Sequence, residues 1–109
     1  MNGLQSFDLE QLGKLAVQAQ PYYEIMRRRG MSLGLYVLPA GSTDRQDPHA
    51  SDEVYVILQG RGTLRVCDQD HEVRPGSVMS VDHGEEHMFI DITDDLHILV
   101  IFAPPDDPD

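Results

Sequence analysis

The chain has 109 residues, enough to bury a single hydrophobic core but too few for two. Its formal net charge of -11 leaves no basic stripe that could follow a phosphate backbone, which argues against nucleic-acid binding. The apolar runs VYVIL and ILVIFA are far shorter than the roughly 18 residues that span a bilayer, and no charged-then-apolar leader opens the sequence. These features predict a soluble, cytoplasmic protein without a membrane segment.

The first predicted element is a short amphipathic helix over residues 8–17. Its expected apolar face consists of Leu9, Leu12, Leu15 and Ala16. Asp8 can cap the first turn, Gly13 weakens the helix, and Pro21 ends the segment. We therefore expect an N-terminal helical segment at residues 1–20.

From Tyr22 onward the pattern changes to short runs rich in Val, Ile, Leu and Tyr. The predicted strands are residues 22–26, 32–38, 53–58, 63–67, 71–73, 77–81, 87–90 and 97–102. Turn-forming segments separate them, among them PAGSTDRQDP, QGRG and DITDD. This density of short strands is typical of an antiparallel sandwich or barrel, and the lack of alternating helices disfavours a doubly wound α/β fold.

The strands are expected to form one all-β domain over residues 21–105. The tail at residues 106–109 combines proline with like charges, which predicts fraying or disorder. The single cysteine, Cys67, cannot form an internal disulfide, and we interpret it as a strand residue without a catalytic role.

The segment DPHASDEVYVILQG, residues 47–60, places polar side chains directly before an apolar strand. Side chains two residues apart in a strand share a face, so Asp47, His49 and Glu53 can point the same way if the strand is regular. Tyr55 and Ile57 would continue that face into the interior. An imidazole and a carboxylate at the mouth of a barrel suit a divalent metal ion, although a solvated loop with an incidental His and Glu is equally compatible.

A second segment, residues 75–91, adds a donor from a distant strand, which a barrel site needs. His87 alternates there with Phe89 and Asp91. Among the remaining histidines, His83 is expected in a turn, facing solvent or at most supporting the ligands. We interpret His71, in a turn, and His97, in an apolar strand, as structural.

At these residues the sequence resembles the cupin family, in particular small single-domain bacterial cupins. The residues at the spacing of the first cupin motif are Gly41, Asp47, His49, Glu53 and Gly60. The residues at the spacing of the second motif are Gly76, Asp82, Gly84, His87 and Asp91. Three positions depart from the pattern, since Asp47 replaces a histidine, Asp82 a proline and Asp91 an asparagine. The resemblance implies a jelly-roll barrel, also called a double-stranded β-helix.

The resemblance further implies that His49, Glu53 and His87 bind one divalent transition metal ion. The fourth position is open: Asp47 is a candidate, Gln46 is another if the strand carries a bulge, and water is the third. The period-2 register favours Asp47, because it lies on the face of His49 and Glu53. Fe, Mn, Zn and Ni all accept such a donor set, so the sequence does not select the metal.

For function, the resemblance implies a small metalloenzyme of dioxygenase, isomerase or lyase type that acts on a small organic acid, phenol or sugar. Tyr55 and Phe89 would shape the pocket, and Tyr55 could supply a proton, although both also suit an ordinary core. The alternatives are a non-catalytic module that binds a metal or small ligand, and a vestigial site. The strand region YYEIMRRRG, residues 22–30, predicts an exposed sheet edge and hence a homodimer.

Overall fold

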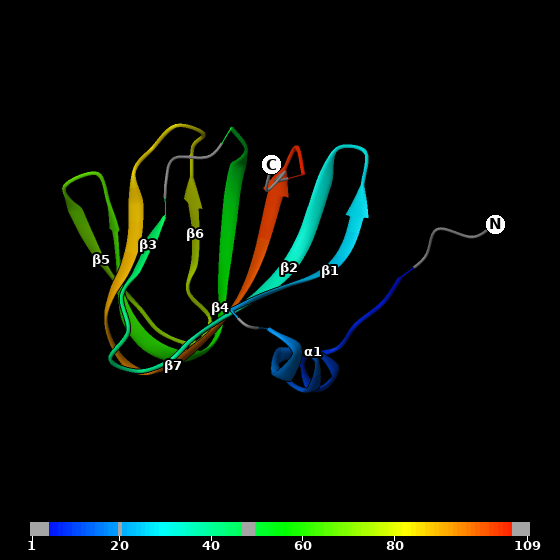
Figure 1. Cartoon of the computed structure of the whole chain (residues 1–109), viewed down its shortest axis with the longest axis horizontal. Coiled ribbons are helices and arrows are strands. Elements are labelled where there is room, and N and C mark those ends of the chain that lie inside the picture. The colour runs from blue at the N-terminus through cyan, green and yellow to red at the C-terminus, as the bar shows by residue number, and fades with distance from the viewer. Residues whose placement is uncertain (1–4, 20, 47–49, 106–109) are drawn as a thin grey trace.

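The computed structural model describes residues 5–19, 21–46 and 50–105, which form a β-barrel extended on one side by a two-stranded ribbon and a short helix (Figure 1). The helices are α1 (Leu9–Leu15) and the 3-10 turn η1 (Ala16–Gln18). The strands are β1 (Tyr22–Arg28), β2 (Met31–Leu38), β3 (Asp44–Gln46), β4 (Asp52–Val66), β5 (Gln69–Val73), β6 (Val78–Val81) and β7 (His87–Ala103). The expected tail at residues 106–109 lies outside the described residues.

Two long strands, β4 and β7, pair antiparallel and contribute to both walls of the barrel. The first half of β4 and the second half of β7 form one wall together with β1, β2 and β6. Their other halves form the opposite wall with β3 and β5. The expected all-β jelly-roll barrel with a short N-terminal helix is therefore confirmed.

Two segments predicted as turns, QGRG and DITDD, are instead bends inside β4 and β7, so four predicted strands merge into two. The β4–β7 register shifts between Ile57 and Thr63, as at a β-bulge. Gly60 has φ +97° and Asp91 has φ +48°, and these conformations turn each strand without ending its pairing. The two strands curve together at the lower end of the barrel in Figure 1.

Two further details of the sequence prediction were wrong. Residues 44–46 were expected to be a loop because they are polar. They form the short strand β3, whose backbone pairs with that of β7. Cys67 was expected in a strand but is exposed in the turn between β4 and β5, with φ +53°. Both differences arise from backbone pairing and turn geometry, which hydropathy does not report.

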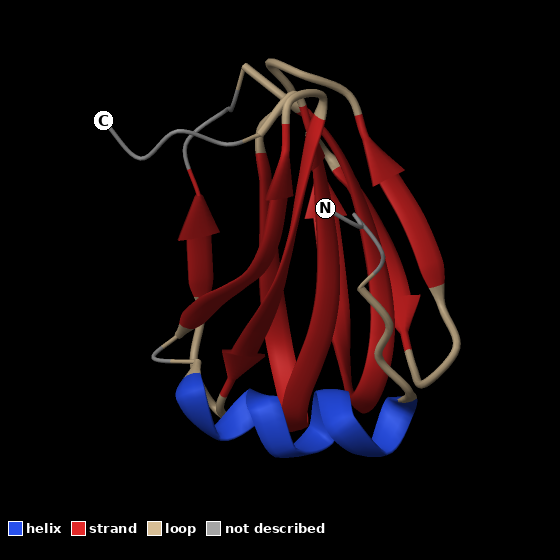
Figure 2. Cartoon of the chain, turned by 90° about the vertical axis from the view of Figure 1, so that its right-hand side faces the viewer, coloured by secondary structure: helices blue, strands red, loops and turns tan. Residues whose placement is uncertain are grey.

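The helix lies across one end of the strands (Figure 2). Asp8 caps it as expected, in a capping box with Gln11. Leu12 and Ala16 are buried, but Leu9 is 73% exposed, so the buried face is narrower than predicted.

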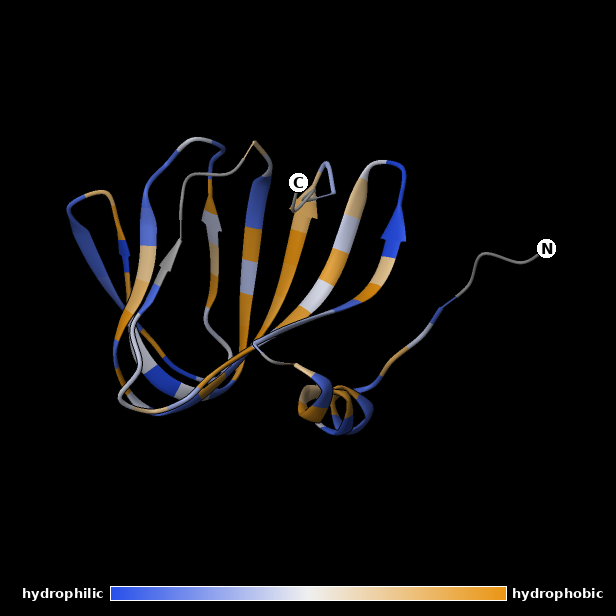
Figure 3. Cartoon of the chain, viewed as in Figure 1, coloured by the Kyte–Doolittle hydropathy of each residue, from blue (hydrophilic) through white to orange (hydrophobic). Residues whose placement is uncertain are grey.

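The core lies between the two walls and follows the period-2 pattern of the strands. Apolar and polar bands alternate along β2 and β4 in Figure 3. The largest fully buried side chains include Tyr55 and Phe89, and Ile57 is also buried, as the sequence predicted. This packing fixes the inner face on which the candidate site lies.

Candidate metal centre

Glu53 and His87 face each other inside the barrel, close to where β4 and β7 begin. Both residues are almost completely buried, with 2% of Glu53 and 4% of His87 exposed. The distance from His87 Nε2 to Glu53 Oε2 is 3.3 Å. Burying a carboxylate is costly unless a cation or several donors compensate its charge, so this pair is a strong candidate for a functional site.

The hydrogen bond at the other ring nitrogen of His87 determines which nitrogen carries the proton. His87 Nδ1 lies 2.9 Å from the backbone carbonyl oxygen of Glu85, which can only accept a hydrogen bond. Nδ1 therefore carries a hydrogen, and in the neutral ring Nε2 presents its lone pair towards Glu53. Two electron-rich atoms at this distance attract each other only through a shared cation, either a proton on Nε2 or a metal ion.

The Tyr55 hydroxyl orients the Glu53 carboxylate by donating a hydrogen bond of 2.7 Å to Glu53 Oε1. Burial, together with the charge of Glu53, raises the pKa of Tyr55 far above its ordinary value. The phenol therefore stays protonated and donates its hydrogen to Glu53, and the expectation that Tyr55 supplies a proton stays a prediction. Its ring packs edge-on against Phe89, with centroids 5.2 Å apart, which holds the hydroxyl in place.

The donor set fits a divalent transition metal ion. Such ions bind imidazole nitrogen and carboxylate oxygen at about 2.0–2.2 Å, so atoms 3.3 Å apart can contact the same ion. The carbonyl of Glu85 on the distal nitrogen of His87 is the kind of partner that orients metal-binding histidines.

The other predicted ligands, Asp47 and His49, lie outside the described residues. The backbone of Gln46 pairs with that of His87. Within residues 5–19, 21–46 and 50–105, no group of three or more His, Cys, Asp or Glu side chains is placed to hold a metal ion.

Two residues that depart from the second cupin motif are Asp82, in the loop between β6 and β7, and Asp91, on β7. The Asp82 backbone N–H donates to Glu85 Oε1 at 2.8 Å, a bond that proline at this position could not make. Asp91 does not share the inward face of His87 and Phe89, as the alternation had suggested. It is exposed, because its positive φ lies at the bend of β7.

The remaining histidines occupy different environments. His83 is exposed, as expected, and its backbone N–H and ring both contact Asp52 Oδ1, at 2.9 and 3.0 Å. The hydrogen bond from the His83 backbone lowers the pKa of Asp52. His97 is half-buried on β7, where it pairs with Val37. His71 lies on β5, where residues 71–73 were predicted as a strand, and it lines a second cavity.

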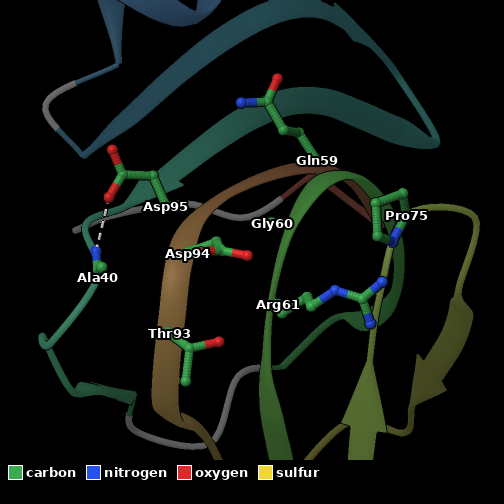
Figure 4. A pocket seen from close by; sticks show the side chains of 8 residues that line it. All are labelled: Ala40, Gln59, Gly60, Arg61, Pro75, Thr93, Asp94 and Asp95. Atoms are coloured by element: carbon green, nitrogen blue, oxygen red, sulfur yellow. Dashed lines mark hydrogen bonds between the residues drawn. The ribbon is translucent and has the colours of Figure 1, made fainter.

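A separate cavity of about 500 Å³ lies at the bends of β4 and β7, away from Glu53 and His87 (Figure 4). Its lining is mixed and includes the polar residues Arg61, Thr93 and Asp94. Asp95 accepts a hydrogen bond of 2.7 Å from the backbone of Ala40 and so ties the β2–β3 loop to β7. This end of the barrel therefore has a structural role in joining its loops.

The family described as Cupin domain matches residues 34–102, which is more than half of the chain. The chain belongs to the cupin family, and the resemblance stated from the two motifs is confirmed. It is 42% identical over 104 residues to Uncharacterized protein SCO3923 of Streptomyces coelicolor, and the alignment covers 94% of this chain and 99% of that protein.

Solved structures show the same fold. TT1209 from Thermus thermophilus superposes with a TM-score of 0.77 at 23% identity, covering 94% of this chain and 99% of that one. The DMSP lyase DddQ from Ruegeria pomeroyi superposes with a TM-score of 0.71 at 18% identity, covering 75% of this chain and 45% of that one. At these identities the likeness concerns the fold.

Among the described residues, no helix is long and apolar enough to cross a bilayer.

Proposed function

We propose that this cupin is a metal-dependent enzyme acting on a small organic molecule, with one divalent ion held by Glu53 and His87 together with His49. Asp47, or Gln46 in its place, would complete the ligand set. The observation that carries the proposal is the buried Glu53 carboxylate 3.3 Å from the Nε2 atom of His87. A bound ion would supply Lewis-acid or redox chemistry at an open coordination position.

The surrounding residues have distinct roles in this proposal. Tyr55 holds Glu53 Oε1, so that Oε2 is directed towards His87. The carbonyl of Glu85 keeps the proton of the neutral His87 ring on Nδ1, which leaves the lone pair on Nε2. Phe89 is fully buried beside Tyr55 and excludes water from behind the site. Together these contacts hold the two donors in place.

Elemental analysis of protein purified without a histidine tag tests the proposal. The parent should contain about one equivalent of a transition metal, and His87→Ala and Glu53→Gln should lose it. The metal-loaded parent should also unfold at higher temperature than its chelated form, because an ion at 100 times its dissociation constant stabilises the fold by about 2.7 kcal/mol.

His97→Ala is the matched control, since His97 is a histidine on the same strand as His87 but lies beyond the bend. Its metal content should equal that of the parent. Equal metal in His87→Ala, Glu53→Gln and His97→Ala would show that the ion binds elsewhere, and a metal-free parent that takes up none in titration would refute the centre.

A non-catalytic binding module is the second candidate. One observation favours it: the hydroxyl of Tyr55 is already engaged as a hydrogen-bond donor to Glu53. Turnover assays with metal-loaded protein separate the candidates. Oxygen uptake or substrate loss that disappears in Glu53→Gln supports the enzyme, and tight binding without turnover supports the module.

A further inference from the structure

A second cavity, of about 310 Å³, adjoins the candidate metal centre and has an apolar floor. The floor consists of Leu64, Val66 and Met79. Directly opposed residues of an antiparallel pair share a face, and here Met79 opposes Tyr55 while Val66 opposes His87. The floor is therefore continuous with the face that carries the Glu53–His87 pair.

The rim of this cavity is polar. Gln69 and His71 contribute from β5, Ser80 from β6 and Glu85 from the loop before β7. Among the described strands, β5 and β6 each pair with β4 and not with each other, so the cavity lies at the gap between two sheet edges. A small molecule can enter through this side of the barrel.

Glu85 connects the rim to the metal centre. Its side chain lines the cavity and accepts a hydrogen bond from Asp82, while its backbone carbonyl holds the ring of His87. A ligand that contacts the Glu85 carboxylate is therefore close to the proposed centre. The volume lies at the low end of the 300–1,000 Å³ typical of small-molecule pockets, which suits a single ring.

We propose that this cavity binds an uncharged, ring-shaped molecule bearing a hydroxyl group, that is, a phenol, with its ring on the apolar floor and its hydroxyl at His71 and Glu85. The inference rests on the proposed function, since it names the substrate class of that site. The rim offers an imidazole, a carboxamide and a carboxylate, which together both donate and accept hydrogen bonds, as a hydroxyl does.

The same lining disfavours other ligand classes. An organic anion would be repelled by Glu85 and by a chain of net charge -11. A sugar would place hydroxyl groups against Leu64, Val66 and Met79, where they would lack hydrogen-bond partners. An organic ammonium could pair with Glu85, but it can only donate hydrogen bonds and would leave the N–H donors of Gln69 unused.

Ligand-observed NMR titrations of the protein as purified test the proposal with 4-methylphenol, 4-methylbenzoate, benzylamine and inositol. 4-Methylphenol should bind at least about tenfold more tightly than each of the other probes. His71→Ala should weaken its binding by about 3- to 10-fold, the effect of one lost hydrogen bond. Glu85→Gln keeps the size of the side chain but removes its charge, so it should strengthen binding of 4-methylbenzoate.

His97→Ala again serves as the control and should bind 4-methylphenol like the parent. The proposal is overturned if His71→Ala and His97→Ala bind equally well, or if 4-methylbenzoate, benzylamine or inositol matches 4-methylphenol in the parent. Metal content measured on the same samples decides the proposed function separately. A parent without metal refutes the metal centre, whereas the dependence on His71 and Glu85 decides the ligand class.

Discussion

Gly60, at the bend of β4, is the position where a single added methyl group should do most damage. Its φ is +97°, a conformation that other residues rarely adopt. A Cβ atom built there would lie 2.8 Å from Leu96 Cα and would also overlap the backbone carbonyl of Asp95. Because these atoms belong to the backbone of β7, they cannot move aside as the end of a side chain could.

The expected cost of Gly60→Ala combines two effects. The strained backbone conformation costs about 1–3 kcal/mol, and displacing a packed backbone costs about 1–3 kcal/mol more. The sum, about 2–6 kcal/mol, is a large part of the stability of a small domain. At roughly 4 °C per kcal/mol, the melting temperature should fall by about 8–24 °C.

Two other glycines separate these effects. Gly76 has φ +93° with no atom within 4 Å of an added Cβ, so Gly76→Ala should cost the strain alone, about 1–3 kcal/mol. Gly13 lies in α1, also with open space, and Gly13→Ala should stabilise by about 0.5–1 kcal/mol through helix propensity. Urea unfolding followed by circular dichroism gives all three values, and the chain has no tryptophan to report by fluorescence.

A Gly60→Ala variant that is no more destabilised than Gly76→Ala would contradict the expected overlap with β7. In that case β4 and β7 would not be held in close contact at the bend. A loss in Gly60→Ala accompanied by retained stability in Gly76→Ala would show that steric overlap, and not backbone strain, dominates.

Three smaller effects follow from other contacts. Asp8→Ala removes the helix cap and should cost about 1 kcal/mol in urea unfolding, whereas Asp8→Asn should cost little. Gly34→Ala places a methyl group against the Tyr22 ring and should cost about 1–3 kcal/mol, a loss that should shrink in the Tyr22→Ala background. Hydrogen bonds from Arg65 lower the pKa of Asp70 below its ordinary 3.8. The Arg65–Asp70 pair therefore stabilises the folded chain above pH 3.8. This stabilisation disappears as the pH falls through the lower pKa that Asp70 has in the folded state. Asp70→Asn should therefore reduce the melting temperature slightly near neutral pH, and this difference should shrink as the pH falls below 3.8. A difference that does not change with pH would contradict the assignment.

The inner face of the barrel could be predicted from the sequence because strand periodicity is a local property. The alternation that placed Tyr55 and Ile57 inside needed no knowledge of the partner strands. Phe89 was placed correctly for the same reason. Motif spacing identified the family, since it records which strand positions a shared fold requires.

The bends and the rim of the second cavity could not be predicted in the same way. Gly60 indicates a turn by its residue type, but whether the chain turns or merely bends depends on its pairing with β7, a strand that comes much later in the sequence. The position of His71 in the lining of the second cavity could not be predicted from its sequence neighbours. It depends on Leu64 across the β4–β5 pair and on Glu85 in a separate loop. Contacts between distant segments decide both features.

The pairing of β4 with β7 also determines when the site can exist during folding. Asp52 pairs with Ala103 and Val66 with His87, so long stretches of chain must be closed before either wall of the barrel is complete. Folds dominated by such distant pairings fold slowly, typically in milliseconds to seconds. Since Glu53 and His87 belong to different long strands, no early local structure brings them together, and the proposed ion could be bound only by a chain that has already completed the barrel.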